Sequence, residues 1–508
     1  MAYGPPVSVS TSVEAVPRRW WSLLGLCLVT ALVWFAASDI SIALPTIGRE
    51  LGGTMDVLQW AVNGYFLAGA FIIVGGRIGD IYGRRLTFAV GTVLLVIGST
   101  VAGLSPSPTV LIIGRVIEGL GAAAVLPTAL SIIAVIFTGR QRDTAVAVWI
   151  AVCWGAQAIG PLIGGLVVDS IGWRWLFWLN LPIAAGALVL TWWATPETRD
   201  LETERRIDWP GVLTLVGGIF VLSYALVASD DVGIPLFIGM LALSVLLLVA
   251  FVFIERRSKA PIVVLSIFRQ PRFDGAVLSN LIANFVFGGV IFFMSLYLQV
   301  VEGYDALMSG LLLLPATIPI LLINPIGTWL GARFGPRWPT AAGMAMLAVA
   351  AFLLTDLSDA YSSAILPFIL IGIGIGLQIT PCAVTAVEDP GEAGEGVASG
   401  IFKASSMIGG SLGVAVGSMV FQTDARSLIE PIISGSAPAD AARKVLDALT
   451  GGMSVSDVSG FISGDAQQVI NGIFEQAVGL AMWPSIIASL LGVAVALLLF
   501  RSRAKTPS

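Results

Sequence analysis

The chain has 508 residues, of which 56% are hydrophobic and 12% are charged. A soluble globular chain carries about 25% charged residues, so this chain cannot cover a water-facing surface of its size. Most of its exterior is therefore expected to face lipid. The net charge of −5 says little about partners, because the signs are segregated along the chain. No basic tract with interleaved aromatic residues is present, which argues against nucleic acid as a partner.

The absence of histidine limits the possible chemistry. Zinc sites of the HExxH type, Ser-His-Asp triads and imidazole proton relays are excluded. No lysine follows a glycine, so a phosphate-binding P-loop is excluded as well. We therefore expect no enzyme activity, no metal and no cofactor, and any energy coupling must use carboxylates and ion gradients. The three cysteines lie in apolar runs and are expected to be free.

Apolar runs follow one another along the chain. Residues 1–19 form a polar tail, and the first apolar run is too long for a signal peptide. Membrane spans are predicted at 20–45, 57–78, 86–104, 108–136, 144–168, 174–194, 209–228, 234–254, 273–300, 306–330, 339–356, 362–387, 396–421 and 476–500. The fold class is thus an all-α membrane protein of about fourteen spans.

The distribution of arginine and lysine gives the orientation. Most of them fall in loops that this layout places on one side together with both termini, including the tail 501–508. The positive-inside rule makes that side cytoplasmic, although one loop there, 388–395, is acidic. The long loop at about 422–474 is then outside, as a spacer or partly ordered cap, and its 441–449 segment could form an amphipathic helix.

An internal repeat divides the chain into two halves. The segment 79–85, GDIYGRR, is echoed by 331–337, GARFGPR, and each copy follows the second span of a six-helix set. We predict an N-terminal half at 20–194, a C-terminal half at 273–500, and two inserted helices with linkers at 195–272. Parallel repeats of this kind place a binding site at their interface near the membrane midplane.

Two glycine-rich motifs are candidates for a conformational switch. In the loop 76–85, glycines allow close approach and the charged residues can make bonds that hold one conformation; the candidates are Gly76, Asp80, Gly83, Arg84 and Arg85. In the fifth span, a proline bends the helix and a GxxxG face packs closely. Its residues are Gly160, Pro161, Gly164 and Gly165, and a packing role alone is an open alternative.

These motifs resemble those of the major facilitator superfamily, and most closely its drug:proton antiporter branch with fourteen spans. The loop 76–85 resembles the superfamily signature. Four further segments resemble motifs of that branch: 39–45, 115–121, 155–165 and 173–182. The resemblance covers the chain from about residue 20 to 500. The resemblance implies export rather than import, and it links Arg115 to proton transfer. The family usually has glutamine at the position of Glu118, so a second titrating acid is possible here.

Charged residues within the spans each require a reason, because a charge at mid-bilayer costs about 2.5–3.5 kcal/mol. Asp39 is predicted to carry protons or bind a cation, with a structural hydrogen-bonded role as the alternative. Arg115 and Glu118 are three residues apart and share a helix face. They form either a structural ion pair or a unit in which Arg115 modulates a protonatable Glu118.

Lys403 departs from the family pattern, in which arginine is usual at the position that looks like Ser406. It could pair with Asp39, receive an anionic part of a substrate, or extend to the cytoplasmic edge of the membrane. Aromatic residues could bind cations through their ring faces, or face lipid or other helices. The candidate substrate-binding residues are Asp39, Trp34, Tyr65, Phe285, Tyr297 and Lys403.

Together these features predict a proton-coupled antiporter that exports lipophilic, mainly cationic, drugs or toxic compounds. It would reside in a bacterial inner membrane as a monomer, with small-molecule substrates, protons and the lipid bilayer as partners. The alternative is a proton-coupled exporter of one metabolite, such as an amphiphilic acid or a siderophore. A membrane enzyme or sensor without transport is the rival from another class.

Overall fold

The computed structural model describes residues 18–52, 55–198, 208–227, 233–258, 261, 263, 265–357, 361–388, 394–429 and 466–500. Secondary structure in these ranges is helical, without a strand. Residues 1–17 of the predicted tail 1–19, the predicted tail 501–508 and the predicted amphipathic segment 441–449 lie outside the described residues. Long apolar sequences form helices because an apolar solvent leaves backbone polar groups no partners except within the helix.

The helices of the first half run from α1 to α9. They are α1 (Arg19–Ser38), α2 (Ile40–Leu51), α3 (Met55–Gly69), α4 (Ile72–Tyr82), α5 (Arg84–Gly103), α6 (Pro108–Ile136), α7 (Gly139–Ile171), α8 (Trp175–Trp178) and α9 (Asn180–Ala194). Two further helices follow, α10 (Trp209–Val227) and α11 (Ile234–Arg257).

The second half begins after a short 3-10 helix, η1 (Leu265–Arg269). It contains α12 (Pro271–Val300), α13 (Ala306–Leu312), α14 (Leu314–Phe334), α15 (Arg337–Leu353), α16 (Tyr361–Glu388), α17 (Gly394–Ile429), α20 (Ala466–Ala481) and α21 (Trp483–Leu499). Helices α17 and α20 extend into the predicted long loop from both ends, so the segment between them is shorter than the predicted 422–474.

Among the described residues, twelve helices are long and apolar enough to cross a membrane. A thirteenth crossing is the pair Val57–Gly69 and Ile72–Tyr82, bent by 40°. The shorter apolar helix Arg337–Leu353 occupies the place of the remaining predicted span. The all-α membrane fold is confirmed, while a total of fourteen crossings stays a prediction.

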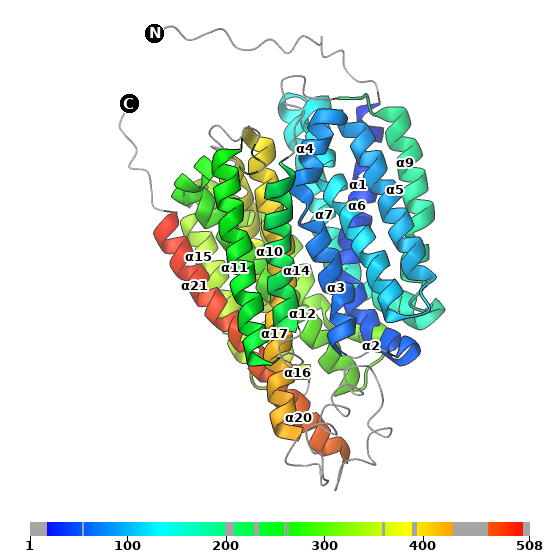
Figure 1. The fold of residues 1–508 in the computed structure, drawn as a ribbon, viewed down its shortest axis with the longest axis vertical. Coiled ribbons are helices and arrows are strands. Elements are labelled where there is room, and N and C mark those ends of the chain that lie inside the picture. Colours follow the sequence, from blue (N-terminus) through cyan, green and yellow to red (C-terminus); the bar gives the residue numbers. More distant parts are fainter. Residues whose placement is uncertain are drawn as a thin grey trace.

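The two halves lie side by side, with α1–α9 in blue and cyan and α12–α21 in green to red (Figure 1). Helix α10 packs against both halves, on α3 and on α17. The ring centres of its Phe220 and Tyr224 lie 5.6 and 5.9 Å from that of Trp60 on α3.

We call the side where α1 begins and α21 ends the terminal face, and the side that carries α2 and α20 the far face (Figure 1). The predicted domain boundaries stay predictions.

Glycines allow close packing of α5 against α6 in the first half. A Cβ added to Gly98 would lie 2.5 Å from the Glu118 nitrogen and 2.6 Å from the Gly114 oxygen. A Cβ on Gly121 would lie 2.7 Å from the Gly91 oxygen. These backbones therefore meet without side chains between them, as small residues allow in membranes. This contact places Glu118 against α5.

We expect Gly98→Ala to lower the thermal unfolding midpoint of the detergent-solubilised protein. The added methyl group would strike backbone atoms, and such overpacking costs about 1–3 kcal/mol. Gly186→Ala on α9 is the matched control, because nothing lies within 4 Å of its Cβ position. An exposed helical Gly→Ala change should be neutral or stabilising by up to about 1 kcal/mol. Equal midpoints for the two variants would contradict the close α5–α6 packing.

Candidate functional site

A buried arginine on α6 connects three helices of the first half. Arg115 is 1% exposed, and its Nη1 donates to a carboxylate oxygen of Glu118 at 2.7 Å. Its Nε donates to the Ala61 oxygen on α3 at 2.9 Å, and its Nη2 to the Ala36 oxygen on α1 at 2.6 Å. The guanidinium also lies 4.4 Å from the ring centre of Tyr65. Each of its three nitrogens therefore has a partner.

The second carboxylate oxygen of Glu118 is bonded as well. It accepts a hydrogen bond from Ser99 on α5 at 2.5 Å, and Ser99 accepts one from Asn180 on α9 at 3.0 Å. Both Glu118 and Arg115 are buried and form an ion pair. This contact is compatible with both roles that the sequence left open, a structural ion pair and a protonatable Glu118 modulated by Arg115, so the choice between them stays a prediction.

Asp39 lies where the first span breaks between α1 and α2. A Cβ on Gly164 would lie 3.0 Å from the Asp39 Cβ, so α7 passes directly beside it. The carbonyl that Arg115 binds, that of Ala36, is less than one turn away from Asp39 on α1. No ion pair involves Asp39 among the described residues. The structure thus brings Asp39 near the pair without neutralising it.

A small cavity lies between the two halves beside Asp39. The first half contributes residues from α1, α2, α3 and α7, and the second half from α12 and α17. The lining residues are Ala37, Ser38, Ser41, Val62, Phe66, Gln157, Asn284, Phe287, Gly288, Ile291, Gly410 and Val414. An interface position is where parallel halves are expected to bind substrate.

The lysine of α17 lies against aromatic rings of the other half. The Lys403 Nζ is 5.4 Å from the ring centre of Trp34, 5.7 Å from that of Trp149 and 5.8 Å from that of Trp154. No ion pair with Asp39 or any other acid is present in the described part of the chain. Trp149 was not a candidate from the sequence, where an isolated tryptophan could equally face lipid.

The other aromatic candidates lie apart from this lysine. The Tyr65 hydroxyl donates to the Val33 oxygen at 2.5 Å, and the ring is fully buried within the first half. Tyr297 is also buried and its hydroxyl donates to Glu302 at 3.0 Å. Phe285 lies where α12 passes α17, and a Cβ on Gly413 would lie 2.0 Å from its oxygen. None of these three lines the cavity described above.

The loop motif at the terminal face is held within its own half. Arg84 donates to Asp80 through Nε at 2.9 Å and Nη2 at 2.8 Å. Gly83 has φ 122°, a conformation that favours glycine. The Glu197 carboxylate accepts from the Arg85 backbone nitrogen at 3.0 Å. Sequence reasoning missed Glu197, since a single acid after an apolar run carries no signal of its partner.

The same motif also faces the second half. Gly76 and Asp80 line a second depression at the terminal face, together with Val397, Ser399 and Gly400 of α17. Of the predicted switch residues in this loop, Gly76 and Asp80 therefore lie where the two halves meet, and the switch role stays a prediction.

The fifth-span motif contacts both halves through different residues. Gly164 lies against Asp39, as described above. A Cβ on Gly165 would lie 2.2 Å from the Ala306 oxygen, and a Cβ on Gly310 would lie 2.4 Å from the Pro161 oxygen. In addition, the Asp169 carboxylate accepts from the Leu307 nitrogen at 2.5 Å. The motif therefore joins α7 to α13 near the far face.

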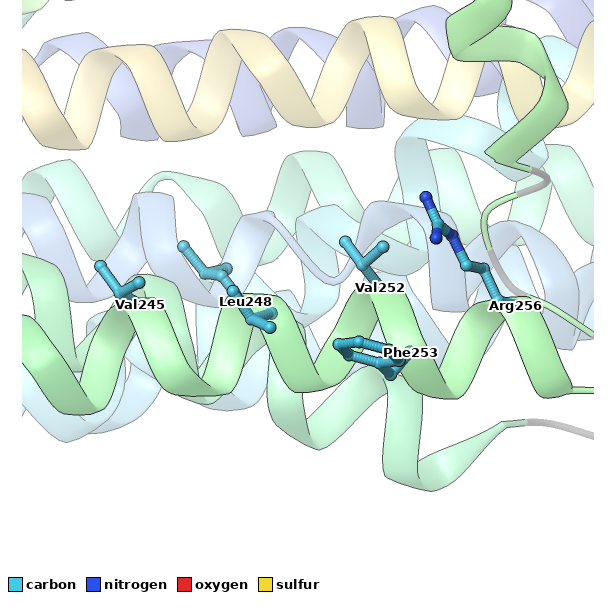
Figure 2. Close-up of a pocket in the computed structure, with 6 residues that line it drawn as sticks. Val245, Leu248, Val252, Phe253 and Arg256 are labelled. Atoms are coloured by element: carbon cyan, nitrogen blue, oxygen red, sulfur yellow. The ribbon is translucent and has the colours of Figure 1, made fainter.

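A separate groove lies on the outside of α11, away from these residues. Figure 2 shows Val245, Leu248, Val252, Phe253 and Arg256 along that helix. Several of these side chains are exposed, including Val245 at 60% and Phe253 at 58%. Because α11 is mostly unburied within the protein, this groove faces lipid and is not part of the cavity between the halves.

Comparisons with known proteins agree with this architecture. The Major Facilitator Superfamily profile matches residues 26–414. The chain is 34% identical to the puromycin resistance protein pur8 of Streptomyces alboniger, covering 81% of this chain and 83% of that protein. It is 32% identical to the multidrug resistance protein Stp of Mycobacterium tuberculosis, covering 84% and 80%.

A solved structure shows the same fold. It is a bacterial homolog of the human lysosomal transporter Spinster, in an inward-facing and unoccupied conformation, with a TM-score of 0.65 and 17% identity over 96% of this chain and 97% of that one. The family profile, the relatives and the two-half helical bundle lead to one conclusion. This chain belongs to the major facilitator superfamily, and it is a membrane transporter rather than an enzyme.

Proposed function

We propose that the protein is a proton-coupled antiporter that exports lipophilic, mainly cationic, drugs or toxic compounds across the bacterial cytoplasmic membrane. Its relatives named above are resistance proteins for puromycin and for multiple drugs, which supports efflux. The observation that carries the coupling is Asp39, an acid that forms no ion pair in the described part of the chain and directly follows Ser38, which lines the cavity between the halves.

Asp39 has the properties that a proton carrier requires. A carboxylate within the membrane is unfavourable without a counter-charge, so it gains from binding either a proton or a cation. The neighbouring Glu118 already has Arg115 and Ser99 as partners. In the proposed cycle a cationic compound binds from the cytoplasm or inner leaflet, and a proton displaces it from Asp39 after the halves rock outward.

The driving force depends on stoichiometry. One pH unit supplies about 1.4 kcal/mol per proton, and the membrane potential about 2.3 kcal/mol per charge per 100 mV. Exchange of one proton for one monovalent cation moves no net charge and uses only the pH gradient.

Both halves that line the cavity belong to one chain, which supports a monomer as the transporting unit.

We expect Asp39→Asn to abolish substrate-driven proton release from acid-loaded inverted vesicles. Asparagine keeps the shape of the protonated acid but cannot exchange a proton, so the signal should fall to that of vesicles lacking the protein. The unfolding midpoint should stay unchanged, since Asp39 has no ion pair to lose. Normal pH-driven transport by this variant would remove Asp39 from the coupling path.

Glu118→Gln should give the opposite pattern. Removing one partner of a buried ion pair costs about 3–5 kcal/mol, so the unfolding midpoint and the folded yield should fall clearly. The molecules that fold should still release protons on adding substrate. A variant of normal stability that has lost coupling would instead make Glu118 a titrating residue.

We also propose that the terminal face is cytoplasmic, which the positive-inside bias supports. Tyr82 is 63% exposed at that face and Leu104 is 65% exposed at the far face. In intact cells, a membrane-impermeant maleimide should label Leu104→Cys and not Tyr82→Cys. The native cysteines are buried, so the unchanged chain is the control, and the reverse labelling pattern would invert the topology.

A further inference from the structure

Lys403 joins the two halves through an unusual contact. The lysine belongs to α17, whereas Trp34 is on α1 and Trp149 and Trp154 are on α7. Its ammonium lies over all three indole rings. We call these three tryptophans the indole cage.

The cage is built as a rigid site. Trp34, Trp149 and Trp154 are 2%, 1% and 7% exposed. The Trp149 Nε1 donates to the Thr30 Oγ1 at 3.0 Å, and the Trp34 and Trp154 rings stack with their centres 6.3 Å apart. These contacts fix the ring faces around one point before any ligand arrives.

The cage lies on the terminal-face side of the cavity between the halves, and none of its residues lines that cavity. Trp34 precedes the lining residue Ser38 by one turn on α1, and Trp154 precedes Gln157 on α7. Lys403 precedes Gly410 by two turns on α17. Since all three helices begin at the terminal face, the cage lies closer to that face than these lining residues do.

The chemistry of the cage favours positive charge. The face of an indole ring is its negative side, and an ammonium within about 6 Å of the ring centre is attracted to it. The same ring faces repel an anion. In the described part of the chain no carboxylate forms an ion pair with Lys403, and the three ring faces lie around its ammonium group.

We propose that the indole cage is a binding site for organic ammonium and phosphonium cations, and that Lys403 occupies it as a tethered competitor. A lipophilic cation that enters the cavity takes the ring faces and displaces the lysine. Displacement also removes one attachment between α17 and the first half, which links cation binding to the movement of the halves. This inference rests on the proposed export of cations.

Binding of a matched pair of ions tests the proposal without any gradient. Tetraphenylphosphonium and tetraphenylborate have the same size and shape and opposite charge. Calorimetric titration of the purified protein at one pH would compare wild type with Lys403→Met, which keeps the side-chain length and removes the charge. We expect Lys403→Met to bind the cation about tenfold more tightly, because it frees ring faces that a cation can use.

Two further variants locate the effect. Adding Trp154→Leu to Lys403→Met should reverse the gain in cation affinity. Adding Trp329→Leu instead, at an exposed tryptophan of α14, should leave the gain in cation affinity unchanged. Unfolding midpoints show whether each variant is folded. If Lys403→Met leaves cation affinity unchanged or lower, the proposal is wrong. If it weakens only the borate, Lys403 is an anion site, as in a metabolite exporter.

The binding result is separate from proton coupling. If wild-type vesicles release no protons on adding substrate while Lys403→Met binds the cation more tightly, only the antiport cycle is refuted and the cage stands. If wild-type vesicles do release protons while Lys403→Met gains no cation affinity, only the cage is refuted.

Discussion

The buried pair of Arg115 and Glu118 is the constraint on which the first half depends. Two charges in the membrane are tolerated only when paired and fully hydrogen-bonded. Arg115 meets this condition by binding carbonyls of α1 and α3, and Glu118 by binding Ser99 on α5. The pair therefore fixes the relative positions of four helices, and with them the end of α1 where Asp39 lies.

Asp39 and Lys403 differ from this pair because neither forms an ion pair in the described part of the chain. Asp39 and Lys403 both lie near the interface of the halves, yet they do not bond to each other. Asp39 is beside α7, and Lys403 is among the indole rings. A charge without a fixed partner can exchange a proton or yield its place to a ligand. The two therefore suit changing roles, while the paired residues suit a permanent one.

Hydropathy and loop charge predicted the helical membrane fold, because both follow from the solvent that each segment faces. The three-residue spacing of Arg115 and Glu118 predicted that they share a face. It could not predict the contacts of Glu118 with Ser99 and, through it, Asn180, because these residues come from other helices. The indole cage could not be predicted from the sequence for the same reason. Lys403 and its three rings lie on three helices, and only packing brings them together.

Helix α7 is where these separate features meet. Gly164 brings the helix against Asp39, and the next residue, Gly165, brings it against Ala306 of the second half. Further toward the terminal face, the same helix carries Trp149 and Trp154 of the cage. In the proposed cycle, a proton arriving at Asp39 changes the charge beside a helix that already contacts α13 at one end and Lys403 along its length. Because packed interfaces switch between discrete arrangements rather than deforming continuously, a local change at Asp39 can favour one arrangement of the halves over the other.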